Sequence, residues 1–300
     1  MSQKIHFDSD GRTLVGELFL PEDHRGGQRH PALVMLAPMG GYKEHAPFHY
    51  APKFAKHGYA VLAFDYSFYG ESEGEPRTLE DPFAKLEDIR SAVTFLTLRQ
   101  EVETDRIGLW GVCAGGGYAF NAAIGDRRVK AVGTASAMVD LAAMVTGGHG
   151  GDWRALMAAA GAARTAYARG EEAQVVPFLP PAGDDGPWRN ARTFYTDPER
   201  NTVPGWKDQN VIWSYDKLIH WNPNEYVHLV APTPILLCAS KDAETVQQSL
   251  TAHERGGDNT DLFLLDGAMH FDLYDQDRFT DPVVERAAEF FAKHLQPDAE

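Results

Sequence analysis

The stretch RIGLWGVCAGGGYAF, residues 106–120, decides the fold of this chain. Its first half is an apolar run typical of a buried strand, and its second half is the glycine-rich start of a helix. Gly111 and Gly115 flank Cys113, as a sharp strand-to-helix turn requires, because that turn holds its central residue in a strained conformation close to its neighbours. Such a turn presents its central side chain at the carboxyl edge of a sheet. We therefore predict that Cys113 is a nucleophile; the alternative is a buried structural cysteine.

The position at a helix N-terminus bears on the reactivity of this thiol. Negative charge is favoured there, because backbone N–H groups and the helix dipole point at the side chain. We therefore expect the pKa of the Cys113 thiol to be lowered and the thiolate to be favoured.

Strand-like and helix-like segments alternate on both sides of this turn. KIHFDSDG and TLVGELFLP predict an antiparallel strand pair that turns at Asp10-Gly11. PALVMLAP, FHYAPKFAKHG and YAVLAFDY predict a strand, a helix that ends at Gly58 and another strand. Later strands are expected at VKAVGTAS, TPILLCAS and DLFLLDGA, with a closing helix at DPVVERAAEFFAKHL. This alternation predicts an α/β fold with a mostly parallel sheet flanked by helices.

A crossover helix is expected within residues 78–100, TLEDPFAKLEDIRSAVTFLTLRQ. Its apolar residues recur at three- and four-residue steps, which indicates one face packed on the sheet. The residues predicted on that face are Phe83, Leu86, Ile89, Val93 and Leu96, and those predicted elsewhere are Glu87, Asp88 and Arg90.

The alternation stops between residues 137 and 230. This region is rich in glycine at VTGGHGGDW, in proline at VPFLPPAGDDGP and in aromatic residues at WSYDKLIHW. We interpret residues 137–230 as an inserted helical lid, and residues 1–136 and 231–300 as the catalytic core. Within the insertion we expect Trp206, Trp213 and Tyr215 to contact substrate; the alternative is that they only pack the lid.

An acid and a histidine follow Cys113 in the order that a catalytic triad on such a sheet requires. Asp242 lies just past the strand TPILLCAS, and His270 just past the strand DLFLLDGA, so both are expected at the edge that carries Cys113. Asp242 could instead cap a helix, and Asp140 is a rival acid. His270 could instead be a surface loop histidine.

A nucleophile of this kind also needs donors for the oxyanion that forms during acyl transfer. The amide of Ala114 is expected to be one, and the loop LAPMGGYKEH to supply the other, with Met39 preferred and Gly40 as its substitute. The alternative for this loop is an ordinary glycine turn.

Composition excludes several classes of partner. The 300 residues carry 28 basic and 43 acidic side chains, a formal net charge of -15, which repels phosphate backbones and anionic membranes. No apolar run has signal-peptide or membrane-span length, so we expect a cytoplasmic protein. We expect no nucleic acid, membrane or cofactor as partner, only a small acyl substrate, and a homodimer stays open.

Metal binding is not expected either. His45 and His49 are four residues apart, but Pro47 lies between them and no glutamate follows as in H-E-x-x-H. Asp65 is expected to organise its turn, and Cys238 to belong to the core.

Five stretches together resemble the α/β-hydrolase family, close to its dienelactone-hydrolase-like branch: APMGGYKEH, AFDYSFYGESEGEPR, RIGLWGVCAGGGYA, KDAET and GAMHFDLYD. The resemblance spans nearly the whole chain and implies an eight-stranded sheet. It also implies a Cys-His-Asp triad, which maps onto Cys113, His270 and Asp242. The long insertion departs from dienelactone hydrolase, so dienelactone itself is not expected as the substrate.

The combined features predict a hydrolase of activated esters, lactones or thioesters that forms an acyl-enzyme on Cys113. A thiolate suits activated carbonyls better than amides. The first alternative is an acyltransferase or ring-closing enzyme that passes the acyl group to an alcohol or amine. The second is a lyase or a non-catalytic binding protein on the same fold.

Overall fold

The computed structural model describes residues 2–147, 152–180, 183, 189–200, 203 and 205–296, so parts of the predicted lid lie outside the described residues. An eight-stranded sheet runs through the molecule in the order β1-β2-β4-β3-β5-β6-β9-β10. The strands are β1 (Ser2–Ser9), β2 (Arg12–Phe19), β3 (His30–Leu36), β4 (Ala60–Phe64), β5 (Val102–Val112), β6 (Val129–Ala135), β9 (Ile235–Ser240) and β10 (Thr260–Leu265).

The sheet is antiparallel only at one edge. β1 pairs with β2 and β2 with β4 in antiparallel register, while every pair from β4 to β10 is parallel. The β1–β2 connection turns at Asp10 and Gly11, both of which have positive φ, 53° and 76°. Every residue of β4 and β9 is buried, as parallel strands covered on both faces require. The predicted α/β fold, its mostly parallel sheet and its leading hairpin are confirmed.

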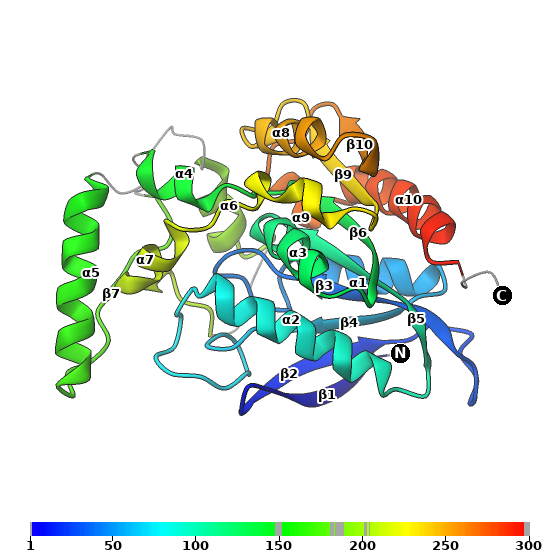
Figure 1. Cartoon of the computed structure of the whole chain (residues 1–300), viewed down its shortest axis with the longest axis horizontal. Helices are drawn as coiled ribbons and strands as arrows, with labels where there is room; N and C mark the ends of the chain where they lie inside the picture. The colour runs from blue at the N-terminus through cyan, green and yellow to red at the C-terminus, as the bar shows by residue number, and fades with distance from the viewer. Residues whose placement is uncertain are drawn as a thin grey trace.

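Helices cover both faces of the sheet (Figure 1). On one face α1, α9 and α10 contact one another, and on the other α2 contacts α3. α8 packs on β9 and β10. The bounds are α1 (Ala46–Lys56), α2 (Pro82–Thr97), α3 (Ala114–Gly125), α8 (Val246–Gly256), α9 (Asp272–Asp275) and α10 (Asp277–His294). No helix in the described ranges is long and apolar enough to cross a membrane.

The buried face of α2 differs from the predicted one. Ile89, Val93 and Leu96 are buried as expected, but the Phe83 side chain is 54% exposed. Lys85 and Asp88 are buried instead. Their charges find partners inside the fold, since the Asp88 carboxylate accepts hydrogen bonds from Ser9 and Ser67, and Lys85 pairs with Glu80. Apolar periodicity misses such residues because it counts hydrophobic side chains alone.

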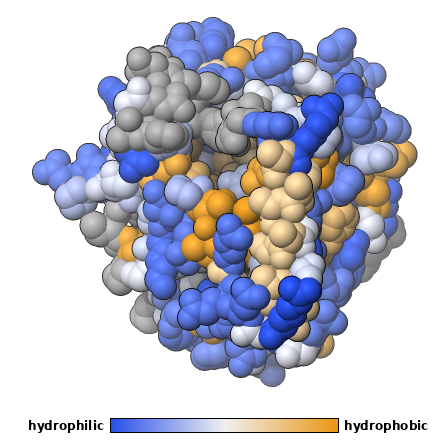
Figure 2. All heavy atoms as spheres, turned by 90° about the vertical axis from the view of Figure 1, so that its left-hand side faces the viewer, coloured by the Kyte–Doolittle hydropathy of each residue, from blue (hydrophilic) through white to orange (hydrophobic). Residues whose placement is uncertain are grey.

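The chain between β6 and β9 departs from the strand-helix alternation, as the sequence predicts. It holds α4 (Leu141–Thr146), α5 (Trp153–Ala168), α6 (Arg189–Thr196), α7 (Tyr215–Leu218) and a two-stranded sheet of β7 (Val175–Val176) and β8 (Asn210–Val211), which the sequence did not indicate. α5 forms one end of the molecule in Figure 1 and buries only Ala160 and Ala163. Figure 2 faces this end and shows apolar side chains surrounded by hydrophilic ones.

Candidate active site

Cys113 lies at the turn between β5 and α3. Its backbone has φ 57° and ψ -124°, a conformation that side-chain-bearing residues rarely adopt and that marks strained functional turns. Gly115 is required beside it, because a Cβ at that position would lie 2.3 Å from the carbonyl oxygen of Leu36 at the end of β3. This close approach brings the loop after β3 next to the turn. The strained strand-to-helix turn predicted around Cys113 is therefore present.

The two amides predicted to form the oxyanion hole meet at the thiol. Hydrogen bonding from the backbone N–H groups of Ala114 and Met39 to the Cys113 sulfur lowers the pKa of the thiol. The N–H of Gly40, the predicted substitute for Met39, donates to the Glu80 carboxylate instead, at 3.0 Å. The geometry thus favours Met39 over Gly40 as the second donor.

The thiol is not activated in the way expected from its place at a helix N-terminus. Cys113 is 5% exposed, and burial raises the pKa of its thiol to about 11, although hydrogen bonds from Tyr274, Ala114 and Met39 lower it. Burial outweighs the amides because a thiolate without water around it loses its solvation. The expected lowering of this pKa is wrong for the structure: at neutral pH the resting thiol is protonated.

His270 lies just past β10 and is fully buried, so the surface-loop alternative is wrong. Its Nδ1 is 2.6 Å from the Thr245 hydroxyl, and its Nε2 is 3.0 Å from the Tyr274 hydroxyl. Ser136, at the end of β6, donates from its hydroxyl to the His270 carbonyl oxygen at 3.1 Å. Burial lowers the pKa of His270 to about 3, so the imidazole is neutral at rest.

The predicted acid Asp242 lies on the same side of the sheet but is exposed to solvent. Its carboxylate accepts a hydrogen bond from the Gly267 N–H at 2.7 Å, three residues before His270, while the contact at Nδ1 is made by Thr245. Asp242 is not the cap of α8, because the N-cap position is Thr245. The rival, Asp140, caps α4 through the Ala143 N–H at 2.8 Å.

An apolar cavity opens at the thiol. Its free space is about 40 Å³. Core and insertion both contribute to its walls. The lining residues are Met39, Cys113, Met138, Met144, Phe178, Leu179, Pro180, Ala191, Tyr195, Tyr215, Phe271 and Tyr274.

The three aromatic residues expected to contact substrate have different places. Tyr215 lines the cavity. Trp206 stacks on Tyr195 at 4.8 Å between ring centroids, and its indole N–H donates to the Gly40 carbonyl at 3.0 Å. Trp213 packs against Tyr167 of α5. Trp206 thus supports the loop that contains Met39 and Gly40, and Trp213 packs within residues 137–230.

The sequence of the chain matches a known family and several known proteins. Residues 10–176 match the family described as X-Pro dipeptidyl-peptidase (S15 family). The chain belongs to this family. Among relatives of this S15-family chain, thiohydrolase aneE of Aspergillus aculeatus is 34% identical over 78% of this chain and 74% of its own length. Polyketide transferase grgF of Penicillium sp is 27% identical over 95% of this chain and 94% of its own.

Two solved structures show the same fold. The hypothetical protein PA2218 from Pseudomonas aeruginosa has 31% identity and a TM-score of 0.88, covering 98% of this chain and 94% of its own. The α/β hydrolase GrgF from Penicillium sp. sh18 has 26% identity and a TM-score of 0.86, covering 98% and 99%. This S15-family chain is an α/β hydrolase, a class that performs hydrolysis or acyl transfer.

The sequence did not indicate a buried ion pair that lies next to the loop of Met39 and Gly40 in this S15-family chain. Glu80 and Lys85 are both fully buried and pair with each other. Glu80 also accepts hydrogen bonds from Tyr69 and Tyr118, both at 2.8 Å or less, besides the one from Gly40. A buried carboxylate with this many donors is held in one position, and it therefore fixes Gly40 next to Met39.

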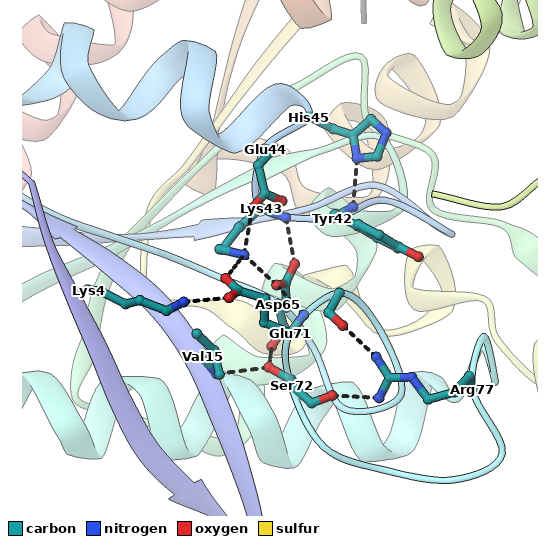
Figure 3. A network of polar contacts seen from close by, with 11 residues as sticks. Lys4, Val15, Tyr42, Lys43, Glu44, His45, Asp65, Glu71, Ser72 and Arg77 are labelled. Carbon is teal, nitrogen blue, oxygen red and sulfur yellow. Dashed lines mark hydrogen bonds and ion pairs between the residues drawn. The ribbon is translucent and has the colours of Figure 1, made fainter. Parts of the chain in front are cut away.

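A second polar network surrounds Lys43, four residues past Met39 (Figure 3). The Lys43 ammonium lies 2.6 to 2.8 Å from one carboxylate oxygen each of Glu44, Asp65 and Glu71. These three carboxylates are close enough to hold a metal ion, but the ammonium already occupies their centre. Asp65 also accepts from the backbone N–H groups of Lys43 and Glu71, so it organises the turn as predicted.

Proposed function

We propose that this protein is a hydrolase of activated esters, lactones or thioesters, and that it works through an acyl-enzyme on Cys113. The observation that carries the proposal is the position of the thiol on a strained turn, facing the amides of Met39 and Ala114 at the wall of an apolar cavity. The name of the relative aneE, a thiohydrolase, supports a thioester among these substrates.

In the proposed reaction, sulfur attacks the carbonyl carbon while the thiol proton leaves toward His270. The carbonyl oxygen becomes an oxyanion that accepts hydrogen bonds from the Met39 and Ala114 amides, which together stabilise the transition state. Collapse of the intermediate expels the leaving group, which takes the proton from His270. Water activated by His270 then attacks the thioester of the enzyme and releases the acid.

We propose that Asp242, in the loop after β9, acts on His270 through the loop that carries the histidine. Asp242, the carboxylate expected from the sequence, binds the Gly267 N–H and so fixes the turn before the histidine. Thr245 at Nδ1 sets the orientation of the ring. We place Asp242 as a positioning residue that acts through the backbone.

Turnover of acyl thioesters tests this proposal, with the released thiol followed by a colorimetric reagent. We expect Cys113→Ala to lower kcat/KM by at least about 10³-fold, since removal of a nucleophile leaves only binding and oxyanion stabilisation. The matched control is Cys238→Ala, which removes the other thiol, buried in β9 and not among the described residues that line the cavity. Unchanged turnover in Cys113→Ala would refute nucleophilic catalysis by this residue.

Acyl transfer is the second candidate function. The lining residues that the structure describes include no charged side chain, and free space at the thiol is small, so water is poorly held there. The relative grgF is named a polyketide transferase. If an added alcohol or amine captures most of the acyl group in competition with water, the protein is a transferase or ring-closing enzyme; if only the free acid forms, it is a hydrolase.

Cleavage of dipeptides, suggested by the family description, fits the cavity less well. A free peptide N-terminus is an ammonium group, which needs a carboxylate partner once it is desolvated. No carboxylate is among the described residues that line the cavity.

We propose that the insertion, residues 137–230, acts as the lid of this cavity, because the walls include Met144, Phe178 and Tyr215.

A further inference from the structure

The hydroxyl of Tyr274 contacts both reactive groups of the site. It lies 3.0 Å from Nε2 of His270, and its hydrogen bonding to the Cys113 sulfur lowers the pKa of the thiol, while Met138 is a second side-chain partner of that sulfur at 4.0 Å. Tyr274 also lines the cavity beside Cys113. The sequence shows the histidine and this tyrosine four residues apart in HFDLY, which places them one helical turn from each other.

From this contact we propose that Tyr274 is a catalytic residue that relays the proton of Cys113 to His270; the inference rests on the proposed acyl-enzyme function. Hydrogen bonds and packing hold its ring in place. The ring is fully buried and lies 4.9 Å, between centroids, from the rings of Phe194 and Phe271. The neighbouring Leu273 carbonyl accepts a hydrogen bond from Tyr50 at 2.6 Å, which anchors the short helix α9.

The contacts of Thr245 with Nδ1, of Tyr274 with Nε2 and of Tyr274 with Cys113 together allow a proton to move from the thiol toward the imidazole. With the neutral imidazole protonated at Nδ1, Thr245 accepts that hydrogen and Nε2 is left as an acceptor. In the relay, the Tyr274 hydroxyl donates to Nε2 and its oxygen accepts the thiol hydrogen of Cys113, which in the resting structure points to the Met138 sulfur 4.0 Å away. Tyr274 then uses its one hydroxyl hydrogen toward His270 and an oxygen lone pair toward Cys113, as a two-proton transfer requires.

The step moves two protons while one bond forms. The Cys113 S–H bond breaks and its proton passes to the Tyr274 oxygen, while the phenolic hydrogen passes to Nε2 of His270. Sulfur attacks the carbonyl carbon, and the carbonyl π electrons move to oxygen, where the Met39 and Ala114 amides bind them. Tyr274 ends the step neutral, and the site holds an imidazolium and an oxyanion.

The acid-base properties of the buried groups fit a transfer that is coupled to attack. Burial raises the pKa of the Cys113 thiol to about 11 and lowers that of His270 to about 3, so a resting thiolate-imidazolium pair is disfavoured. Burial also raises the pKa of Tyr274, so the phenol stays neutral between transfers.

Alkylation of the thiol by iodoacetamide tests the relay without a substrate, and it forms no oxyanion. We expect Tyr274→Phe and His270→Ala each to slow alkylation of Cys113 at pH 7 by about tenfold or more. The double variant should be no slower than the slower single variant, because both remove the same path. The control Tyr50→Phe removes a buried hydroxyl that binds the preceding residue of α9, and it should leave the rate within about threefold.

The relay is overturned if the Tyr274→Phe variant is alkylated at the wild-type rate. It is also overturned if the two rate reductions multiply in the double variant. The wild-type protein gives an independent measurement in mixtures of H2O and D2O. A two-proton relay predicts a curved dependence of the rate on deuterium fraction, whereas a straight line overturns it. If acyl substrates leave no adduct on Cys113, the proposed function fails instead; if they do and Tyr274→Phe alkylates normally, the relay alone fails.

Discussion

At the residue scale, the environment of Cys113 explains why its thiol is protonated at neutral pH. The turn supplies two amides that favour negative charge, but the insertion and the core together exclude water from the sulfur. The turn could be predicted from its glycines. The burial could not, because it depends on side chains such as Phe178 and Tyr195 that reach the cavity from an irregular segment.

Two carboxylates in the loop between β9 and α8 differ in burial, and substitution separates their roles. Both carboxylate oxygens of Glu244 are shielded from solvent, and its charge raises the pKa of Tyr274, whereas Asp242 is exposed. A buried charge acts more strongly on an imidazolium that forms nearby than a solvated one. We expect Glu244→Gln to lower kcat/KM by about tenfold or more, and Asp242→Asn to lower it by less than about threefold. Steady-state kinetics with a thioester checks both values, and the reverse order would restore Asp242 as the acid that acts directly.

At the element scale, the strands and helices that carry the site were predictable because each has a simple signature. β5, β9 and β10 are apolar runs, and the predicted site residues Cys113, Asp242 and His270 follow their ends. Thr245 gave no such signal, since a hydroxyl contributes to neither apolar periodicity nor a triad motif. Tyr274 could have been found only from its four-residue spacing to His270.

The turn itself can be tested through its glycines. A Cβ at Gly115 would lie 2.3 Å from a backbone oxygen of β3, which neither element can accommodate without moving. We expect Gly115→Ala to destabilise the protein by more than about 2 kcal/mol, a steric effect at the upper part of the usual range. Gly161→Ala in the exposed helix α5 is the matched control, because a Cβ there meets nothing within 4 Å. It should stabilise by about 0.5 to 1 kcal/mol, and urea unfolding measures both changes.

At the scale of the whole molecule, the core and the chain between β6 and β9 differ in how well the sequence predicts them. The core repeats one pattern of buried strand and covering helix. The other segment packs through individual contacts, such as Trp206 with Tyr195 and Arg164 with Asp216, that have no period. The sequence therefore located this segment but not β7, β8 or the roles of its aromatic residues.

Stability should fall as the pH decreases below about 6.5, because His45 and His270 are buried in their neutral form. Burial lowers the pKa of each to about 3, from an ordinary 6.5, so the unfolded chain binds protons that the folded one does not. Stability is then lost as the pH falls from 6.5 toward 3, by about 1.4 kcal/mol per pH unit for each histidine.

The variant His45→Phe isolates one of these contributions. As the pH is lowered from 6 to 4, its free energy of unfolding relative to the wild type should rise by about 1.4 kcal/mol per pH unit. Urea unfolding at a series of pH values measures this difference. A difference that does not change with pH would contradict the assignment of His45 as a buried neutral histidine.

The central claim is that Cys113 carries the acyl group during the reaction, and mass spectrometry of the intact protein tests it most directly. The protein is mixed with a panel of p-nitrophenyl esters and acyl thioesters, quenched in acid within one turnover, and digested to locate any added mass. We predict one acyl group per chain, on the peptide that contains Cys113, and none on Cys113→Ala. Turnover of the same substrates without an adduct at any time, or with an adduct on another residue, would contradict the account.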